Sequence, residues 1–194
     1  FAEALGADAN GDGRLGQDEA TGHPRSWFGF VDLDADGALN EEEWDFYTAA
    51  LESRNGILGI RVGGEGDMTE ESVVWTYHRR VPQLPSPLLF GDVLYMVNDG
   101  GIVTSLDPGS GEMLAQGRLA GAVDSYYASP VAADGKIFMA SELGKIAVLE
   151  PGGGLDVVAV NDLDDLLYAT PAIADGRIYV RTRSTLYCFG RSGD

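Results

Sequence analysis

The chain of 194 residues has a single cysteine, Cys188, and few basic residues. One cysteine excludes an internal disulfide and a zinc site built from cysteines. In the run LYCF, Cys188 is predicted to be a small buried apolar residue rather than a nucleophile. Thirteen Lys and Arg against 31 Asp and Glu give a net charge of −18. Such a charge repels phosphate backbones and anionic lipid surfaces, so nucleic acid is not an expected partner.

Long apolar runs are also missing. No stretch approaches the roughly 20 residues of a spanning helix, so no membrane span is predicted. No charged and then apolar leader precedes Phe1, and the chain does not begin with Met. We therefore expect a processed or shortened piece of a longer protein. With 44% apolar and 23% charged residues, the balance is that of a globular chain that buries a core.

The best-defined motif is the twelve-residue stretch DLDADGALNEEE, from Asp32 to Glu43. Oxygen-bearing residues stand at positions 1, 3, 5, 7 and 12, and Gly37 supplies the sharp turn at position 6, as in an EF-hand loop. Calcium takes six to eight oxygen ligands, which explains this spacing. The expected ligands are the side chains of Asp32, Asp34, Asp36 and Glu43 and the backbone carbonyl of Ala38.

A second copy, DANGDGRLGQDE, lies 24 residues upstream. Its expected ligands are the side chains of Asp8, Asn10, Asp12 and Glu19 and the carbonyl of Arg14. Two copies in a small region favour two calcium sites over acidic turns without an ion. Leu15 and Leu39, both at position 8, are predicted to pair as a short ribbon. The later loop has one more ionised ligand and is predicted to bind calcium more tightly.

The residues around the loops indicate short helices and a structural role for the ion. Asn40 is predicted to cap a helix, with Glu43 as its capping-box partner. Trp44, Tyr47 and Leu51 recur at helical spacing and are predicted to lie in the core, as is Trp27 with its neighbours. A calcium sensor needs an opening groove, often rich in methionine, but all four methionines lie outside residues 1–53. Dockerin modules also pair such loops, but typically with Asp at position 12, so this alternative ranks second.

Beyond residue 55 the pattern changes to short β-type runs that repeat. The stretches SPLLFGDVLYMV, SPVAADGKIFMA and TPAIADGRIYVR align in register, at steps of 43 and 41 residues. The landmarks are Pro87, Pro130 and Pro171, and Tyr95, Phe138 and Tyr179. A blade is expected to be a sheet of four short strands. Each stretch is taken as one strand, a second strand follows each, and a third follows the first two. A period of about 40–50 residues with Gly and Pro turns is typical of β-propeller blades.

The sequence thus predicts a mainly β chain, with a small α-helical EF-hand pair over residues 1–55 and about three propeller blades over residues 56–194. Three blades do not close a ring, because propellers have at least four. The third repeat stops at Asp194, after its second predicted strand. We expect the remaining blades and outer strands in an N-terminal part of the longer protein.

The repeats resemble the PQQ-binding-like, or quinoprotein-like, β-propeller proteins, some of which carry EF-hands. The resemblance covers residues 56–194, through VVWTYHRRVPQLPSPLLFGDVLYMVNDGGIVTSLDPGSGEML, YYASPVAADGKIFMAS and ATPAIADGRIYVRT. It implies a propeller of seven or eight blades, exported to the periplasm or the cell surface. Repeats of this family commonly end in TGxxxW, whereas the corresponding stretch here has Gln116 in place of the Trp.

Two functions follow as hypotheses. The preferred one is a calcium-stabilised, exported scaffold or binding protein whose propeller face binds a protein or polysaccharide. The alternative, implied by the resemblance, is a PQQ-dependent dehydrogenase whose cofactor residues lie mostly outside this chain. A non-enzymatic role is preferred, because no catalytic set can be assembled from these residues. Tyr126, Tyr127 and Tyr168 are candidate channel-facing residues, with packing between blades as the alternative.

Overall fold

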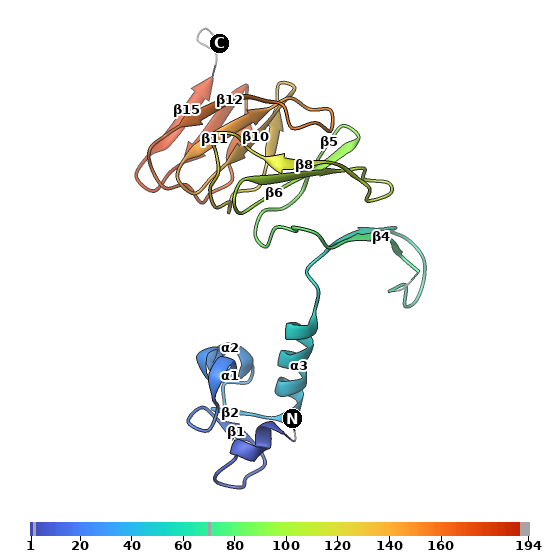
Figure 1. Cartoon of the computed structure of the whole chain (residues 1–194), viewed down its shortest axis with the longest axis vertical. Coiled ribbons are helices and arrows are strands. Elements are labelled where there is room, and N and C mark those ends of the chain that lie inside the picture. The colour runs from blue at the N-terminus through green and yellow to red at the C-terminus, as the bar shows by residue number, and fades with distance from the viewer. Residues whose placement is uncertain (2, 70, 191–194) are drawn as a thin grey trace. The chain divides into compact units, whose positions relative to one another are not determined.

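The computed structural model describes residues 1, 3–69 and 71–190. The chain divides into two compact units, Phe1–Arg54 and Asn55–Asp194, each treated by itself below (Figure 1). Residues 191–194, where the third predicted repeat stops, lie outside the described residues. No helix in the described part is long and apolar enough to cross a membrane.

The first unit consists of short helices and a two-residue ribbon. Its elements are η1 (Ala4–Ala7), β1 (Leu15–Gly16), α1 (Gly22–Ser26), α2 (Phe28–Val31), β2 (Ala38–Leu39) and α3 (Glu41–Glu52). Strands β1 and β2 pair antiparallel with Leu15 opposite Leu39, and both leucines are buried, as predicted. The apolar core that they form also includes Ala20, Phe28, Val31 and Tyr47.

Helix α3 begins as predicted. The Asn40 side chain accepts a hydrogen bond from the backbone N–H of Glu43, and the Glu43 side chain accepts one from the N–H of Asn40. This capping box satisfies donors that the first turn of a helix leaves free. The predicted apolar faces were wrong at two positions. Trp27 and Leu51 are exposed, because the unit is too small to cover a wide apolar stripe on each helix.

The second unit is built from antiparallel sheets that follow one another along the chain. The first pair of strands is β3 (Ile57–Ile60) with β4 (Val73–Tyr77). A four-stranded sheet follows, with β5 (Leu88–Phe90), β6 (Val93–Asn98), β7 (Ile102–Leu106) and β8 (Met113–Arg118). The next has β9 (Val131–Ala133), β10 (Lys136–Ala140), β11 (Lys145–Leu149) and β12 (Val157–Asp162). The last has β13 (Ala172–Ala174), β14 (Arg177–Arg181) and β15 (Leu186–Gly190).

The first two repeats have the four strands expected of a blade, but the strand boundaries correct the prediction. Each stretch taken as a single strand, such as SPVAADGKIFMA, forms two paired strands, because a turn divides it. In the later two repeats the turn residues are Asp134–Gly135 and Asp175–Gly176, all with positive φ. Two consecutive residues with positive φ form a tight turn whose twist matches the right-handed twist of the paired strands. The sheets therefore have four, four and three strands.

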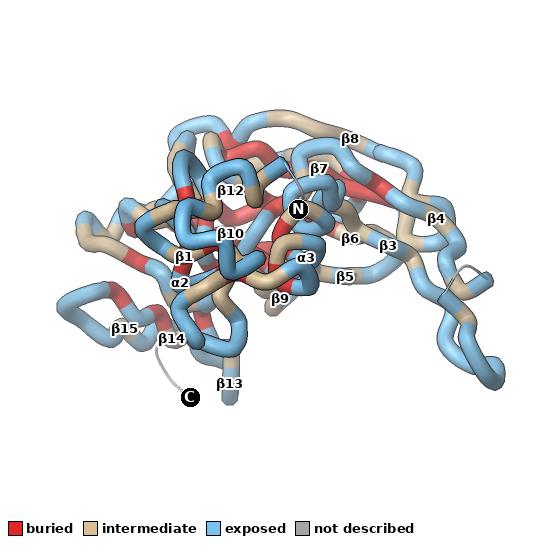
Figure 2. Tube along the Cα trace, turned by 90° about the horizontal axis from the view of Figure 1, so that it is seen from below, coloured by how far each residue is buried: buried red, intermediate tan, exposed pale blue. Residues whose placement is uncertain are grey.

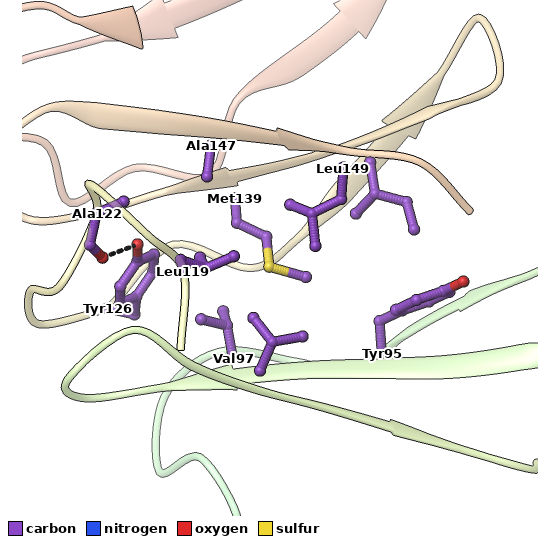
Figure 3. Packing of buried hydrophobic residues seen from close by; sticks show 10 residues of the cluster. Tyr95, Val97, Leu119, Ala122, Tyr126, Met139, Ala147 and Leu149 are labelled. Carbon is purple, nitrogen blue, oxygen red and sulfur yellow. Dashed lines mark hydrogen bonds between the residues drawn. The ribbon is translucent and has the colours of Figure 1, made fainter. Parts of the chain in front are cut away.

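The largest core lies between the two four-stranded sheets, where buried residues (red in Figure 2) of both sheets meet. Met139 and Leu149 point toward Val97 and Tyr95 of the opposite sheet (Figure 3). The Tyr95 hydroxyl is part of this packing, since it accepts hydrogen bonds from the N–H groups of Gly152 and Gly153, at 2.9 and 3.0 Å. Apolar burial and these bonds join the sheets face to face.

A second set of hydrogen bonds joins the sheets just before their first strands, β5, β9 and β13. The N–H of Ser86 donates to Ser129 Oγ at 2.9 Å, and the N–H of Ser129 donates to Thr170 Oγ1 at 3.0 Å. The steps between these residues are 43 and 41, as for the sequence landmarks. The hydroxyl residues that precede the aligned prolines therefore link one sheet to the next.

The prediction for Cys188 was wrong, because the residue is exposed. It lies on β15, which pairs only with β14 among the described strands. Side chains alternate between the two faces of a strand. Tyr187 packs against the core between the second and third sheets, so the neighbouring Cys188 points to the other, uncovered face.

Candidate metal centre

The two predicted calcium loops fold in the same way around their side chains. Six of the hydrogen bonds from backbone N–H groups to loop side chains are common to both loops, each recurring 24 residues later in the chain. The N–H of Gly13 donates to Asp8 Oδ2 at 2.9 Å, and that of Gly37 donates to Asp32 Oδ2 at 3.0 Å. The glycines have φ of +81° and +91°, the left-handed conformation that the turn needs.

The glutamates at position 12 of the loops also accept hydrogen bonds from backbone N–H groups. Glu19 Oε1 accepts from the N–H groups of Ala9 and Asn10, and Glu43 Oε1 accepts from those of Leu33 and Asp34. Each glutamate thereby ties the start of its loop to its end. Glu43 is buried at 4% exposure, and these bonds to backbone donors offset the cost of burying its charge.

In the second loop the aspartates converge. One oxygen each from Asp32, Asp34 and Asp36 lies within 4.8 Å of the others, a unique group of this kind within the described chain. Two oxygens bound to one calcium ion are at most about 5.2 Å apart, twice the longest usual Ca–O distance. The three carboxylates therefore fit one calcium ion, and hard oxygen donors suit that ion. The carbonyl of Ala38 and the Glu43 carboxylate complete the predicted set.

The first loop has the same backbone frame but less charge. Its predicted donors are the side chains of Asp8, Asn10, Asp12 and Glu19 and the Arg14 carbonyl, and an amide stands where the second loop has Asp34. Asp8 and Glu19 are half-buried, while Asn10 and Asp12 are exposed. The donor chemistry fits calcium here too, with one ionised ligand fewer.

A contact between the loops was missed by the sequence analysis. The Arg14 guanidinium of the first loop lies 2.5 Å from Asp36 Oδ2 of the second, and both side chains are about a third exposed. The hydrogen bond from Arg14 lowers the pKa of the Asp36 carboxyl below its usual value and raises the pKa of Arg14. Sequence separation hid this pair, because only the pairing of β1 with β2 places position 7 of one loop beside position 5 of the other.

We predict that Arg14→Gln tightens calcium binding at the second loop by about two- to fivefold, the range of an exposed ion pair. The substitution removes a positive charge that occupies a ligand oxygen, and it keeps the Arg14 backbone carbonyl. Isothermal titration calorimetry with calcium measures the effect. Arg25→Gln is the matched control, because Arg25 is exposed and has no ion pair in the described part of the chain. Equal affinities in both variants would contradict the prediction.

Comparison with known proteins addresses the second unit. No protein-family model matches the chain, and no curated protein does. Among solved structures, BamB from Moraxella catarrhalis matches with a TM-score of 0.51 and 23% identity, over 62% of this chain and 38% of that one. The second unit is part of a β-propeller. This chain thus spans less than half the length of the propeller protein it matches, and at this identity the likeness concerns the fold.

Two propeller dehydrogenases match more weakly. A europium-containing methanol dehydrogenase has a TM-score of 0.40 and 14% identity, over 50% of this chain and 20% of that one. The quinohemoprotein alcohol dehydrogenase ADHIIG from Pseudomonas putida has a TM-score of 0.41 and 13% identity, over 50% and 16%.

The three candidate tyrosines of the propeller separate into two kinds. Tyr126 is buried, and its hydroxyl donates to the carbonyl of Ala122 at 2.7 Å (Figure 3). Burial raises the pKa of this hydroxyl, and its role is packing. Tyr127 and Tyr168 are 36% and 51% exposed, with ring centroids 5.2 Å apart. They occupy equivalent positions in consecutive repeats and form an exposed aromatic pair.

Proposed function

We propose that this chain belongs to an exported binding protein in which a β-propeller presents a face to a protein or polysaccharide partner, and in which calcium stabilises the EF-hand pair. The observation that carries the calcium part is the convergence of Asp32, Asp34 and Asp36 inside a backbone frame that occurs twice. A turn that merely happens to be acidic needs neither the convergence nor the repetition.

A structural role suits the EF-hand pair better than a sensory one. The carboxylate of Glu43 serves both the predicted ion site and the start of α3, so ion binding and helix formation support each other. Helices α1 and α2 have five and four residues, and they are too short to open a groove for a target helix. The methionine content of the sequence agrees, since residues 1–53 contain none.

The exposure of the loops supports a place outside the cytoplasm. Four of the predicted ligand side chains, Asn10, Asp12, Asp34 and Asp36, are exposed, and Arg14 competes for one of them. Sites of modest affinity, with Kd of roughly 10⁻⁴–10⁻³ M, are usual in extracellular calcium modules. Such sites fill where calcium is plentiful, as in the periplasm or outside the cell.

Calcium titration by calorimetry, combined with thermal melting, tests the proposal. We expect two calcium ions per chain, with the second loop filling first. At a calcium concentration a hundredfold above Kd, binding at one site adds about 2.7 kcal/mol to the stability of the folded form. A chelator removes this gain, and magnesium, which needs tighter octahedral geometry, restores less of it. Absence of binding at millimolar calcium would refute the calcium part.

A further inference from the structure

A small pocket of about 190 Å³ opens on the propeller where the segment before β5 meets the end of β6. Leu84, Asn98, Asp99 and Tyr127 contribute to its wall. Its volume is below the roughly 300–1,000 Å³ of sites for drug-sized ligands, so it fits one large side chain better than a whole cofactor. Asp99 is the single charged residue in the wall as described.

The repeat that follows has the same positions, but there the tyrosine and the carboxylate are bonded to each other. Ser141 stands where the first repeat has Asn98, and its hydroxyl accepts from the N–H of Lys145 at 3.2 Å. Glu142 stands in place of Asp99, and Tyr168 in place of Tyr127. The Tyr168 hydroxyl donates to Glu142 Oε1 at 2.8 Å, which raises the pKa of Tyr168. In the second repeat the tyrosine hydroxyl and one carboxylate oxygen are therefore already paired.

In the first repeat the equivalent side chains have polar atoms without a hydrogen-bond partner among the described residues. Asn98 Oδ1 is buried and receives no hydrogen bond within the described chain. Asp99 Oδ1 accepts from the N–H of Tyr126 at 3.0 Å, whereas Oδ2 has no partner among the described residues. The Tyr127 hydroxyl likewise makes no hydrogen bond there. A buried acceptor left unpaired costs about 1–3 kcal/mol, which a ligand that donates to it recovers.

The chemistry of these groups selects the ligand. Two neighbouring acceptors, one of them negatively charged, call for a cation with several donors. The guanidinium group of arginine carries five N–H donors in a planar fork and suits such a pair. Tyr127 offers a ring face to a cation, and Leu84 and the nearby prolines offer apolar contact to an aliphatic stem. The net charge of −18 also attracts a basic partner.

We propose that this pocket binds an arginine side chain of a protein partner, with Asn98 and Asp99 as acceptors and Tyr127 and Leu84 as walls. The inference rests on the proposed binding role of the propeller face and narrows its partner to a protein with an exposed arginine. It is independent of calcium, so its test and the calcium titration fail separately.

The test is an NMR titration of the whole chain with N-acetyl-arginine-N′-methylamide. The expected dissociation constant is on the order of millimolar, because a single side chain offers few atoms for binding. The isosteric citrulline amide, which lacks the charge, is expected to bind roughly tenfold more weakly. Cellobiose serves as a probe for a sugar site, and it is expected to leave the signals of the pocket unchanged.

The repeats themselves provide the variants. Asn98→Ser introduces the residue of the next repeat, and Asp99→Asn keeps the acceptor for Tyr126 but removes the charge. Each is expected to weaken arginine binding roughly three- to tenfold while thermal melting stays unchanged. Glu142→Gln is the control, because Glu142 is already bonded to Tyr168, and it should leave binding as it is. Equal binding of arginine and citrulline amides, no binding of either, or binding of cellobiose alone would overturn the proposal.

Discussion

Replacing Glu43 by Gln is expected to abolish calcium binding at the second loop, with an affinity loss on the order of a hundredfold or more. The substitution removes one of four ionised ligands and one of the two oxygens that bind a calcium ion from position 12. It also places an amide NH₂ near the N–H groups that now donate to Glu43, at Leu33 and Asn40. Two donors that face each other repel, so the start of α3 should loosen as well.

Calorimetry gives the result as a stoichiometry that falls from two ions to one. Glu42→Gln is the matched control, because Glu42 is exposed, lies in the same helical turn and loses the same charge. Glu19→Gln removes the corresponding ligand of the first loop and should leave the second filled. Melting without calcium separates the loss of the capping box from the loss of the ion. Two ions still bound to Glu43→Gln would refute the assignment of Glu43 as a ligand.

A large loss of stability is expected from Gly101→Ala, which should cost more than about 3 kcal/mol. Gly101 has φ of +64°, and an added Cβ would lie 2.6 Å from the backbone carbonyl oxygen of Ala122. Since this oxygen belongs to the backbone, the clash moves the segment between the two four-stranded sheets, where Ala122 is fully buried. Urea unfolding, monitored by circular dichroism, measures the change.

Gly91→Ala is the control for backbone strain. Gly91 has nearly the same φ, +61°, but nothing lies within 4 Å of an added Cβ. Its substitution should cost only the penalty of a left-handed residue, about 1–2 kcal/mol. Similar losses in the two variants would show that conformation and not crowding makes Gly101 necessary.

The repeat register could be read from the sequence because both hydrogen bonds and apolar contacts recur at its period. Ser86, Ser129 and Thr170 stand one residue before the aligned prolines and carry the inter-sheet bonds. The split of each first strand was missed, although a signal was present. Asp-Gly between two apolar runs is a strong hairpin signal, and both Asp134–Gly135 and Asp175–Gly176 form such turns.

The candidate sites were predictable where the ligands are close in sequence. They were not predictable where tertiary structure brings together residues that are distant in sequence. The spacing of Asp32, Asp34 and Asp36 was enough to predict their convergence, because a local turn brings them together. The contact of Arg14 with Asp36 depends on the pairing of two loops, which composition and spacing do not describe. The exposure of Cys188 also depends on tertiary structure, since it follows from what covers its sheet.

The hydroxyl bonds between successive sheets have a direction. At both steps the earlier sheet donates the N–H and the later sheet offers the hydroxyl, and Ser129 does both, with Ser86 and Thr170 as its partners. Because these bonds have the same form at both steps, they do not fix how many sheets follow one another. Duplication or loss of one whole repeat leaves every other joint intact, so proteins assembled in this way can change the number of repeats in evolution without redesigning their contacts.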